Sequence, residues 1–242
     1  MSVFTKAIVV GASSGIGAEI ARVLAERGCK VAVVARRMDR LERLRGENPE
    51  RVFAFRHDVL CYEEVPALFQ EITKQLGGLD LVVYAAGVMP EIGPNEYDFA
   101  KDKAILEVNL LGCVAWMNQA AIRFENTRSG TIVAIGSVAG DRGRAGQPVY
   151  NASKAAVATY MEALRNRLAR HGVRVVTVKP GPTKTEMTEA LHQRGMMDAR
   201  TAAEIILRKS RKTGEHYLKL SHALAFWVVK RIPSPIFRRM KL

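Results

Sequence analysis

Residues 11–17, Gly-Ala-Ser-Ser-Gly-Ile-Gly, join a short apolar run to an amphipathic stretch. The run at residues 7–10 is typical of a buried strand, while residues 18–27 carry apolar side chains at helical spacing and end at a glycine. A second apolar run, residues 30–35, follows. A glycine-rich turn between a strand and a helix can hold a pyrophosphate, because the N–H groups at the start of the helix face the anion. The spacing Gly-x-x-x-Gly-x-Gly alone also fits a structural turn, but its setting favours nucleotide binding.

The same alternation continues along the chain. We expect further strands at 51–56, 79–85, 131–135, 173–178 and 215–220, and helices at 63–76, 98–126, 148–170 and 201–212. Strands that alternate with long helices predict an α/β fold, here a single Rossmann-type doubly wound parallel sheet of about seven strands with helices on both faces. A length of 242 residues suits one domain, residues 1–242.

The N-terminus contains no basic region followed by a long apolar run, so we expect no secretory signal. The longest apolar runs are shorter than the roughly 18 residues of a membrane span. The three cysteines are widely spaced, which suits a reducing compartment better than a disulfide framework. We expect a cytoplasmic protein without metal ligands.

Two arginines, Arg36 and Arg37, follow the second expected strand, where an acidic residue would bind the ribose hydroxyls of NAD. An arginine at this position accommodates the 2′-phosphate of NADP. We therefore predict NADP (NADPH) as the cofactor, with Arg36 on the phosphate and Ser14 as a possible helper. A solvated pair of charges is the alternative explanation.

Tyr150 and Lys154 lie four residues apart in an expected helix, so their side chains share one face. A phenol has a pKa of about 10, and a neighbouring ammonium group lowers it towards the range in which proton transfer is efficient. Such a pair is also common on solvated helix faces. It indicates a site only together with a cofactor.

Four motifs occur in one order: Gly11-x-x-x-Gly15-Ile16-Gly17, Asn109, Ser137 and Tyr150-x-x-x-Lys154. In this order they resemble the single-domain branch of the short-chain dehydrogenase/reductase family, over roughly residues 6–188. The resemblance implies an oxidoreductase that interconverts a carbonyl and a secondary alcohol by hydride transfer. Tyr150 would be the general acid or base, and Ser137 would bind the substrate oxygen. Lys154 would bind the nicotinamide ribose hydroxyls and, together with the positive charge of the oxidised ring, lower the Tyr150 pKa. Asn109 would hold a water of a proton relay.

The resemblance also implies a cofactor site. Asp58 and Val59 would border the adenine, residues 180–183 would lie along the nicotinamide, and residues 183–200 would form the substrate loop. The expected cofactor-binding residues are Gly11, Ser13, Ser14, Gly15, Ile16, Gly17, Arg36, Arg37, Asp58, Val59, Ala86, Gly87, Tyr150, Lys154, Pro180, Gly181 and Thr183.

The chain departs from the family at Tyr84-Ala85-Ala86-Gly87, where the family usually has Asn-Ala-Gly, often with another Asn before it. The side-chain amides that commonly brace the central sheet are therefore absent. Gly87 still permits close approach of a cofactor, so we expect altered bracing and unchanged proton-transfer groups.

The net charge of +13 is concentrated near the C-terminus: residues 194–242 contain twelve Lys or Arg and three acidic residues. Residues 221–242 mix apolar and basic side chains, with Trp227 and Phe237 among them. This segment could lie on an anionic membrane as a peripheral contact, which would suit an apolar or lipid-like substrate. A helix that packs on its own domain or on a partner subunit explains the same residues.

The family resemblance further implies a homodimer or homotetramer with a small-molecule carbonyl or alcohol substrate. A catalytically silent NADP-binding protein, regulatory or membrane-associated, is the alternative. The basic tail has no aromatic stacking platform and no recognised nucleic-acid motif, so we expect no nucleic-acid partner.

Overall fold

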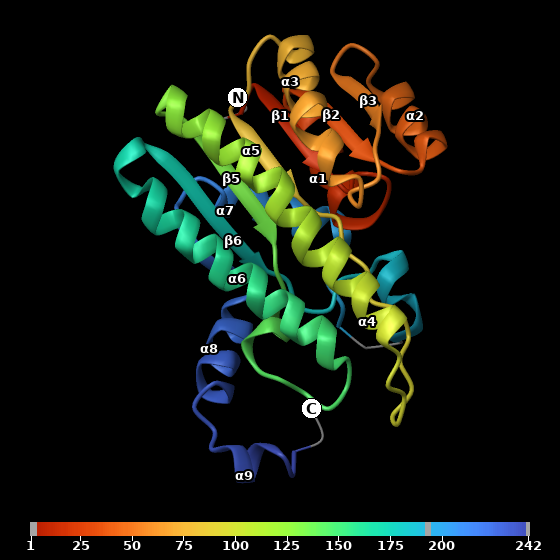
Figure 1. The fold of residues 1–242 in the computed structure, drawn as a ribbon, viewed down its shortest axis with the longest axis vertical. Coiled ribbons are helices and arrows are strands. Elements are labelled where there is room, and N and C mark those ends of the chain that lie inside the picture. Colours follow the sequence, from red (N-terminus) through yellow and green to blue (C-terminus); the bar gives the residue numbers. More distant parts are fainter. Residues whose placement is uncertain (1–3, 192–194, 241–242) are drawn as a thin grey trace.

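A computed structural model describes residues 4–191 and 195–240 and shows one central sheet between two layers of helices (Figure 1). Within these residues the sheet has seven parallel strands in the order β3-β2-β1-β4-β5-β6-β7. Their bounds are β1 Lys6–Val10, β2 Lys30–Ala35, β3 Val52–Arg56, β4 Leu81–Tyr84, β5 Gly130–Ile135, β6 Val173–Lys179 and β7 Gly214–Tyr217. The predicted fold class is confirmed.

Each face of the sheet has its own core, because successive strand residues point to opposite sides. Val9 and Val33 pack against α1 (Gly15–Glu26), α2 (Met38–Glu47) and α7 (Ala199–Lys209). Ile8 and Val34 belong to the opposite core, which contains residues of α3 (Val65–Leu76), α5 (Gly112–Thr127) and α6 (Pro148–Leu168). Strands buried on both faces explain the continuous apolar runs in the sequence.

The helix expected at 98–126 is present but not uniform. It consists of α4 (Phe99–Leu106), a π-helical turn at Glu107–Leu111 and α5. The whole segment Phe99–Thr127 is long and apolar enough to cross a membrane. The side chains that it turns to the sheet, among them Trp116 and Phe124, are however fully buried, whereas Phe99 and Ile122 are exposed. The apolar composition of this segment is therefore explained by its packing in the core.

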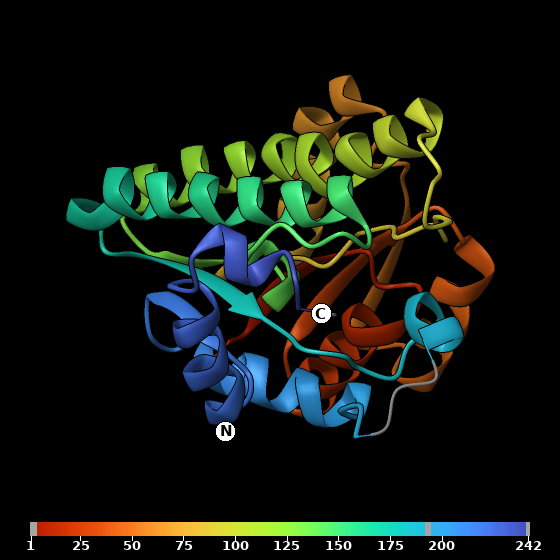
Figure 2. The ribbon, with the colours of Figure 1, turned by 90° about the horizontal axis from the view of Figure 1, so that it is seen from below.

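The C-terminal segment differs from the expectation in its details. The strand expected at 215–220 ends at Tyr217, and α8 (Leu220–Val229) and α9 (Ser234–Phe237) follow. Both helices lie at the end of the molecule to which β5 and β6 point (Figures 1 and 2). One face of α8 packs on its own domain, where the rings of Phe226 and Tyr217 stack at 6.4 Å. The opposite face is exposed.

Candidate functional site

The carboxyl ends of parallel strands meet at one edge of a sheet, and a pocket lies at this edge. Seventeen of the nineteen residues predicted from the sequence line it: Gly11, Ser13, Ser14, Gly15, Ile16, Gly17, Arg36, Arg37, Val59, Ala86, Gly87, Ser137, Tyr150, Lys154, Pro180, Gly181 and Thr183. Asn109 and Asp58 lie beside the pocket without lining it.

The glycine-rich turn between β1 and α1 forms a cradle that only glycine permits. A Cβ atom on Gly11, whose φ is +85°, would lie 2.3 Å from the backbone nitrogen of Ala86. A Cβ on Gly17 would lie 2.3 Å from the Gly11 carbonyl oxygen. Among the described residues, the Ser14 side chain at the start of α1 caps no N–H group. The first turn of α1 can therefore direct its N–H groups at the pyrophosphate of a dinucleotide, and the cradle fits that group.

The two arginines at the end of β2 have different surroundings. Arg37 donates to Ser13 Oγ from Nε at 3.1 Å and from Nη2 at 2.9 Å, and Nη2 also donates to Ser14 Oγ at 2.8 Å. Arg36 has a side chain that is 63% exposed and lies 3.8 Å from the Asp58 carboxylate. A guanidinium beside two hydroxyls suits a phosphate, so these contacts favour Arg37 for the role that the sequence suggested for Arg36.

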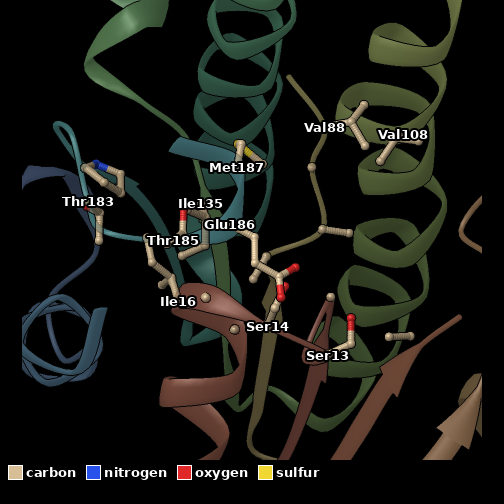
Figure 3. A pocket seen from close by; sticks show the side chains of 18 of the residues that line it. Ser13, Ser14, Ile16, Val88, Val108, Ile135, Thr183, Thr185, Glu186 and Met187 are labelled. Atoms are coloured by element: carbon tan, nitrogen blue, oxygen red, sulfur yellow. The ribbon is translucent and has the colours of Figure 1, made fainter. Parts of the chain in front are cut away.

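A carboxylate from the expected substrate loop completes this end of the pocket. Glu186 begins a 3-10 helix, Glu186–Leu191, and accepts a hydrogen bond from Arg37 Nη1 at 2.9 Å and another from Arg40. These two hydrogen bonds lower the pKa of Glu186. Figure 3 shows the carboxylate of Glu186 pointing towards Ser13 and Ser14. The loop thus already places an anion on the guanidinium that a cofactor phosphate would contact.

Ser137, Tyr150 and Lys154 come together in the wall of the pocket. Ser137 follows β5, and its hydroxyl accepts a hydrogen bond from the N–H of Ala139 at 3.0 Å. Tyr150 and Lys154 extend from α6, as their spacing predicts, with the Lys154 ammonium 5.7 Å from the centre of the Tyr150 ring. Lys154 Nζ donates to the carbonyl of Ile135 at 3.0 Å.

Burial dominates the titration of this pair, so the Tyr150 pKa shifts in the direction opposite to the effect of a neighbouring ammonium group alone. Tyr150 is only 9% exposed, and burial raises the pKa of its phenol, although a hydrogen bond with Ser137 and the charge of Arg144 oppose the rise. Burial also lowers the pKa of Lys154 to about 8. A lysine that loses its charge near this pH contributes less to stabilising a phenolate.

Asn109 lies in the π-helical turn, and its side chain braces the backbone that follows β4. Its Oδ1 accepts from the N–H of Val88 at 2.7 Å, and its Nδ2 donates to the Val88 carbonyl at 3.0 Å and to Ser153 Oγ at 3.2 Å. Gly87 separates Asn109 from Lys154, since a Cβ on Gly87 would lie 3.3 Å from Asn109 Oδ1 and 3.6 Å from Lys154 Nζ.

Tyr84, at the departure from the family pattern, makes a different bracing contact. Its buried hydroxyl donates to the carbonyl of Val108 at 2.6 Å, next to Asn109. Burial raises the pKa of the phenol well above its usual value, so it remains a donor. A phenol thus connects β4 to the π-helical turn without a side-chain amide at residues 84–87.

The segment after β6 connects the remaining parts of the site. The Pro180 carbonyl accepts from the N–H of Val138, which joins this segment to the Ser137 turn. The Thr183 hydroxyl donates to the Gly181 carbonyl at 3.0 Å. Residues 192–194 of the predicted substrate loop lie outside the described residues, whereas Thr185 to Thr188 line the pocket.

Sequence reasoning missed several lining residues, namely His57, Val88, Val108 and Ile135, and it did not single out Thr185, Glu186 and Thr188 within the predicted substrate loop. His57 could have been found as the residue before Asp58 at the end of the third strand. Glu186 carried no local signal, because its partners lie about 150 positions earlier in the chain.

Comparison with known proteins identifies the family of the chain. A family model described as short chain dehydrogenase matches residues 5–195. An uncharacterised oxidoreductase of Mycobacterium tuberculosis is 36% identical over 189 residues, covering 76% of this chain and 75% of that protein. A 3-oxoacyl-acyl-carrier-protein reductase of Bos taurus is 35% identical over 188 residues, covering 76% of this chain and 78% of its own.

A solved structure is also similar. A variant of actinorhodin polyketide ketoreductase with NADPH superposes with a TM-score of 0.79 and 26% sequence identity, covering 90% of this chain and 97% of the other. The region that the family model matches, residues 5–195, includes the glycine cradle and the helix that carries Tyr150. The chain belongs to the short-chain dehydrogenase family.

Proposed function

We propose that the protein is an NADP(H)-dependent reductase or dehydrogenase that interconverts a carbonyl compound and a secondary alcohol. The observation that carries the proposal is the joint placement of Ser137, Tyr150 and Lys154 in the pocket whose other end is the glycine cradle. A tyrosine on a solvated helix face, the alternative for the isolated motif, would not be 9% exposed and line a pocket.

Different residues of the pocket would bind different parts of NADP(H). The first turn of α1 would bind the pyrophosphate, Arg37 with Ser13 and Ser14 would bind the 2′-phosphate, and Lys154 would bind the nicotinamide ribose. Asp58 and Val59 would border the adenine. Preference for NADP(H) is supported by the guanidinium at the end of β2 and by the relative with NADPH in its structure.

In the reductive direction, bound NADPH would supply the hydride for the carbonyl carbon. Ser137 donates a hydrogen bond to the carbonyl oxygen, where negative charge develops. Tyr150 transfers its phenolic proton to the same oxygen, which completes the alcohol. Burial raises the pKa of this phenol, so Tyr150 carries its proton before the transfer. Lys154 holds the ribose beside Tyr150, and Asn109 is assigned to the proton relay.

We further propose that residues 1–242 act as one catalytic domain in the cytoplasm and that residues 183–200 form the substrate loop. Met187 lines the pocket and offers an adaptable apolar contact, which favours an apolar or lipid-like carbonyl compound. Family resemblance suggests a homodimer or homotetramer. Peripheral membrane contact through residues 221–242 is a separate proposal with its own observations.

The test is NADPH oxidation by the purified full-length protein with a panel of ketones and aldehydes, beside titrations of NADPH and NADH. We expect turnover of part of the panel and tighter binding of NADPH. Tight binding of NADPH without oxidation by any carbonyl, and without NADP⁺ reduction by the matching alcohols, would instead support the catalytically silent alternative. Binding of neither cofactor would reject both.

A further inference from the structure

The outer face of the C-terminal helices exposes large apolar side chains. On α8, Leu220 is 78%, Leu224 63% and Trp227 58% exposed, and they follow helical spacing with Val228. Ile236 of α9 is 57% exposed and Met240 is 41% exposed. We name the exposed residues of α8 the docking face: Leu220, Leu224, Trp227 and Val228. Apolar side chains that gather on one exposed face mark an interaction site, whereas single exposed apolar residues are ordinary.

This face is not an incompletely packed inner surface, because the opposite side of α8 already packs on the domain. Phe226 stacks on Tyr217, and the His222 ring lies against Gly181, where an added Cβ would be 2.1 Å from its Cε1 atom. The two contacts fix the rotation of α8 about its axis. The docking face must therefore point away from the domain.

A buried cluster of charges holds the end of α8 in place. Asp141, whose side chain is fully buried, accepts from Lys179 Nζ at 2.6 Å and from the Tyr217 hydroxyl at 2.8 Å, and its carboxylate lies 2.9 Å from Lys230 Nζ. Arg142 donates to the carbonyl of Lys230 at 3.1 Å and lies 4.6 Å from the centre of the Phe237 ring. The helices are thereby fastened to the turn that carries Ser137.

The charges of the C-terminal segment itself are all of one sign. Residues 220–242 contain five Lys or Arg and no Asp or Glu. The Arg231 guanidinium lies 4.1 Å above the Trp227 ring, and Arg238 and Arg239 are exposed after α9. Lys230 is compensated by Asp141. Arg231, Arg238 and Arg239 are the other described charges of this segment, and the segment contains no acidic residue that could compensate them.

We propose that the docking face binds an anionic lipid bilayer. Apolar and aromatic side chains flanked by Lys and Arg suit the boundary between acyl chains and headgroups. Charge complementarity favours anionic lipid over a second copy, since a symmetric contact through this face would bring two segments of net positive charge together. The proposal goes beyond the proposed reaction and does not depend on it.

Binding of α8 to a bilayer would also determine where the pocket lies relative to the lipid. Gly181 lines the pocket and contacts His222 on the inner side of α8, so the helix lies between the docking face and the pocket wall. Binding to a bilayer would bring the substrate end of the pocket close to the lipid surface. An apolar carbonyl compound dissolved in the membrane would then be near the site.

The test is co-sedimentation of the full-length protein with vesicles of phosphatidylcholine alone and of phosphatidylcholine mixed with phosphatidylserine. We expect binding to the anionic vesicles that weakens as salt is added. The double variant Leu224→Ser/Trp227→Ser should bind about tenfold more weakly. Arg238→Gln and Arg239→Gln should each weaken binding about fivefold. Tyr97→Ser, at a side chain 96% exposed elsewhere, and Arg43→Gln should bind normally.

Trp227 also serves as a probe, because the only other tryptophan, Trp116, is fully buried. Brominated phospholipid should quench the fluorescence of the wild-type protein and leave that of Trp227→Phe almost unchanged. NADPH binding and the circular dichroism spectrum establish that each variant is folded. NADPH oxidation is measured in the absence of vesicles, so that the proposed reaction is tested independently of lipid binding.

Two results would overturn the proposal. The first is failure to bind anionic vesicles, or binding that the docking-face variants do not weaken. The second is self-association in solution that Leu224→Ser/Trp227→Ser abolishes, which would identify a second copy of the chain as the occupant.

Discussion

The end of the pocket at Arg37 gives the most specific prediction for cofactor choice. Arg37→Met should weaken NADPH binding and leave NADH binding nearly unchanged, because its guanidinium donates to both Ser13 and Ser14 at the position where a 2′-phosphate is expected. Arg36→Met should have a smaller effect, since this side chain is 63% exposed and its nearest acidic group is 3.8 Å away.

The expected magnitudes follow from the kinds of contact that are lost. Hydrogen bonds to a charged group contribute about 2 kcal/mol, so Arg37→Met should raise the Kd of NADPH about thirtyfold. For the more exposed Arg36, the loss should be below about 1 kcal/mol, or less than about fivefold.

Glu186→Gln should change NADPH binding in the opposite direction and make it tighter. Its carboxylate accepts from Arg37 at 2.9 Å and is half exposed, so it competes with a phosphate for the same guanidinium. Removing a unit charge near a doubly charged phosphate at an exposed site should gain about 1 kcal/mol, which is about fivefold tighter NADPH binding. NADH binding should change by less than about twofold if the two effects are separate.

The assay is calorimetric titration of both cofactors at two salt concentrations, with Arg43→Met as the control because Arg43 lies on the exposed side of α2 and pairs with Asp39. Added salt should reduce the effects on NADPH and leave NADH nearly unaffected. If Arg36→Met weakens NADPH binding more than Arg37→Met does, and leaves NADH binding unchanged, Arg36 binds the 2′-phosphate, as the sequence suggested. Equal losses for NADPH and NADH in Arg37→Met would refute the phosphate assignment of that residue.

Three further predictions concern the architecture of the site. Burial lowers the pKa of Lys154 from 10.5 to about 8, so between these pH values the native protein binds fewer protons than the unfolded chain. The free energy of unfolding, measured relative to that of Lys154→Met, should therefore rise by about 3 kcal/mol from pH 8 to 10.5. A free-energy difference that stays flat or falls with pH would contradict a lowered pKa for the buried Lys154. Tyr84→Phe should lower the free energy of unfolding by about 1–3 kcal/mol, because the buried Val108 carbonyl loses its donor; urea titration with an unchanged midpoint would contradict this. Gly11→Ala should destabilise the fold far more than Gly28→Ala, since φ is similar at the two positions but only a Cβ on Gly11 meets backbone atoms; equal losses would mean that the cradle is not tight.

Local patterns were sufficient to predict the sheet and most of the pocket. The strands β1 to β6 are mainly apolar, and the glycines at 11, 15 and 17 occupy a turn whose geometry excludes side chains. The residues that follow parallel strands must meet at one edge, so their positions in the sequence place them in the pocket. By contrast, α2 was not predicted, because only Leu41 and Leu44 of its ten residues are buried.

Contacts between distant segments could not be predicted in the same way. The hydrogen bond between Glu186 and Arg37 depends on how the substrate loop folds back over α1 and α2. The contact from Tyr84 to Val108 depends on the π-helical turn, for which the sequence gives no periodic signal. The raised pKa of Tyr150 depends on its three-dimensional surroundings, whereas the spacing from Lys154 suggested the opposite direction.

The most direct test of the proposed function follows deuterium from the nicotinamide of NADPH to the product of any carbonyl compound that the protein turns over. With the wild-type protein, mass spectrometry should find the deuterium on the carbon that bears the new hydroxyl group. Tyr150→Phe should bind NADPH within about twofold of the wild type and lose activity by about a hundredfold to ten-thousandfold, the usual contribution of a general acid. An unlabelled alcohol, or a Tyr150→Phe protein that retains its activity, would contradict the account.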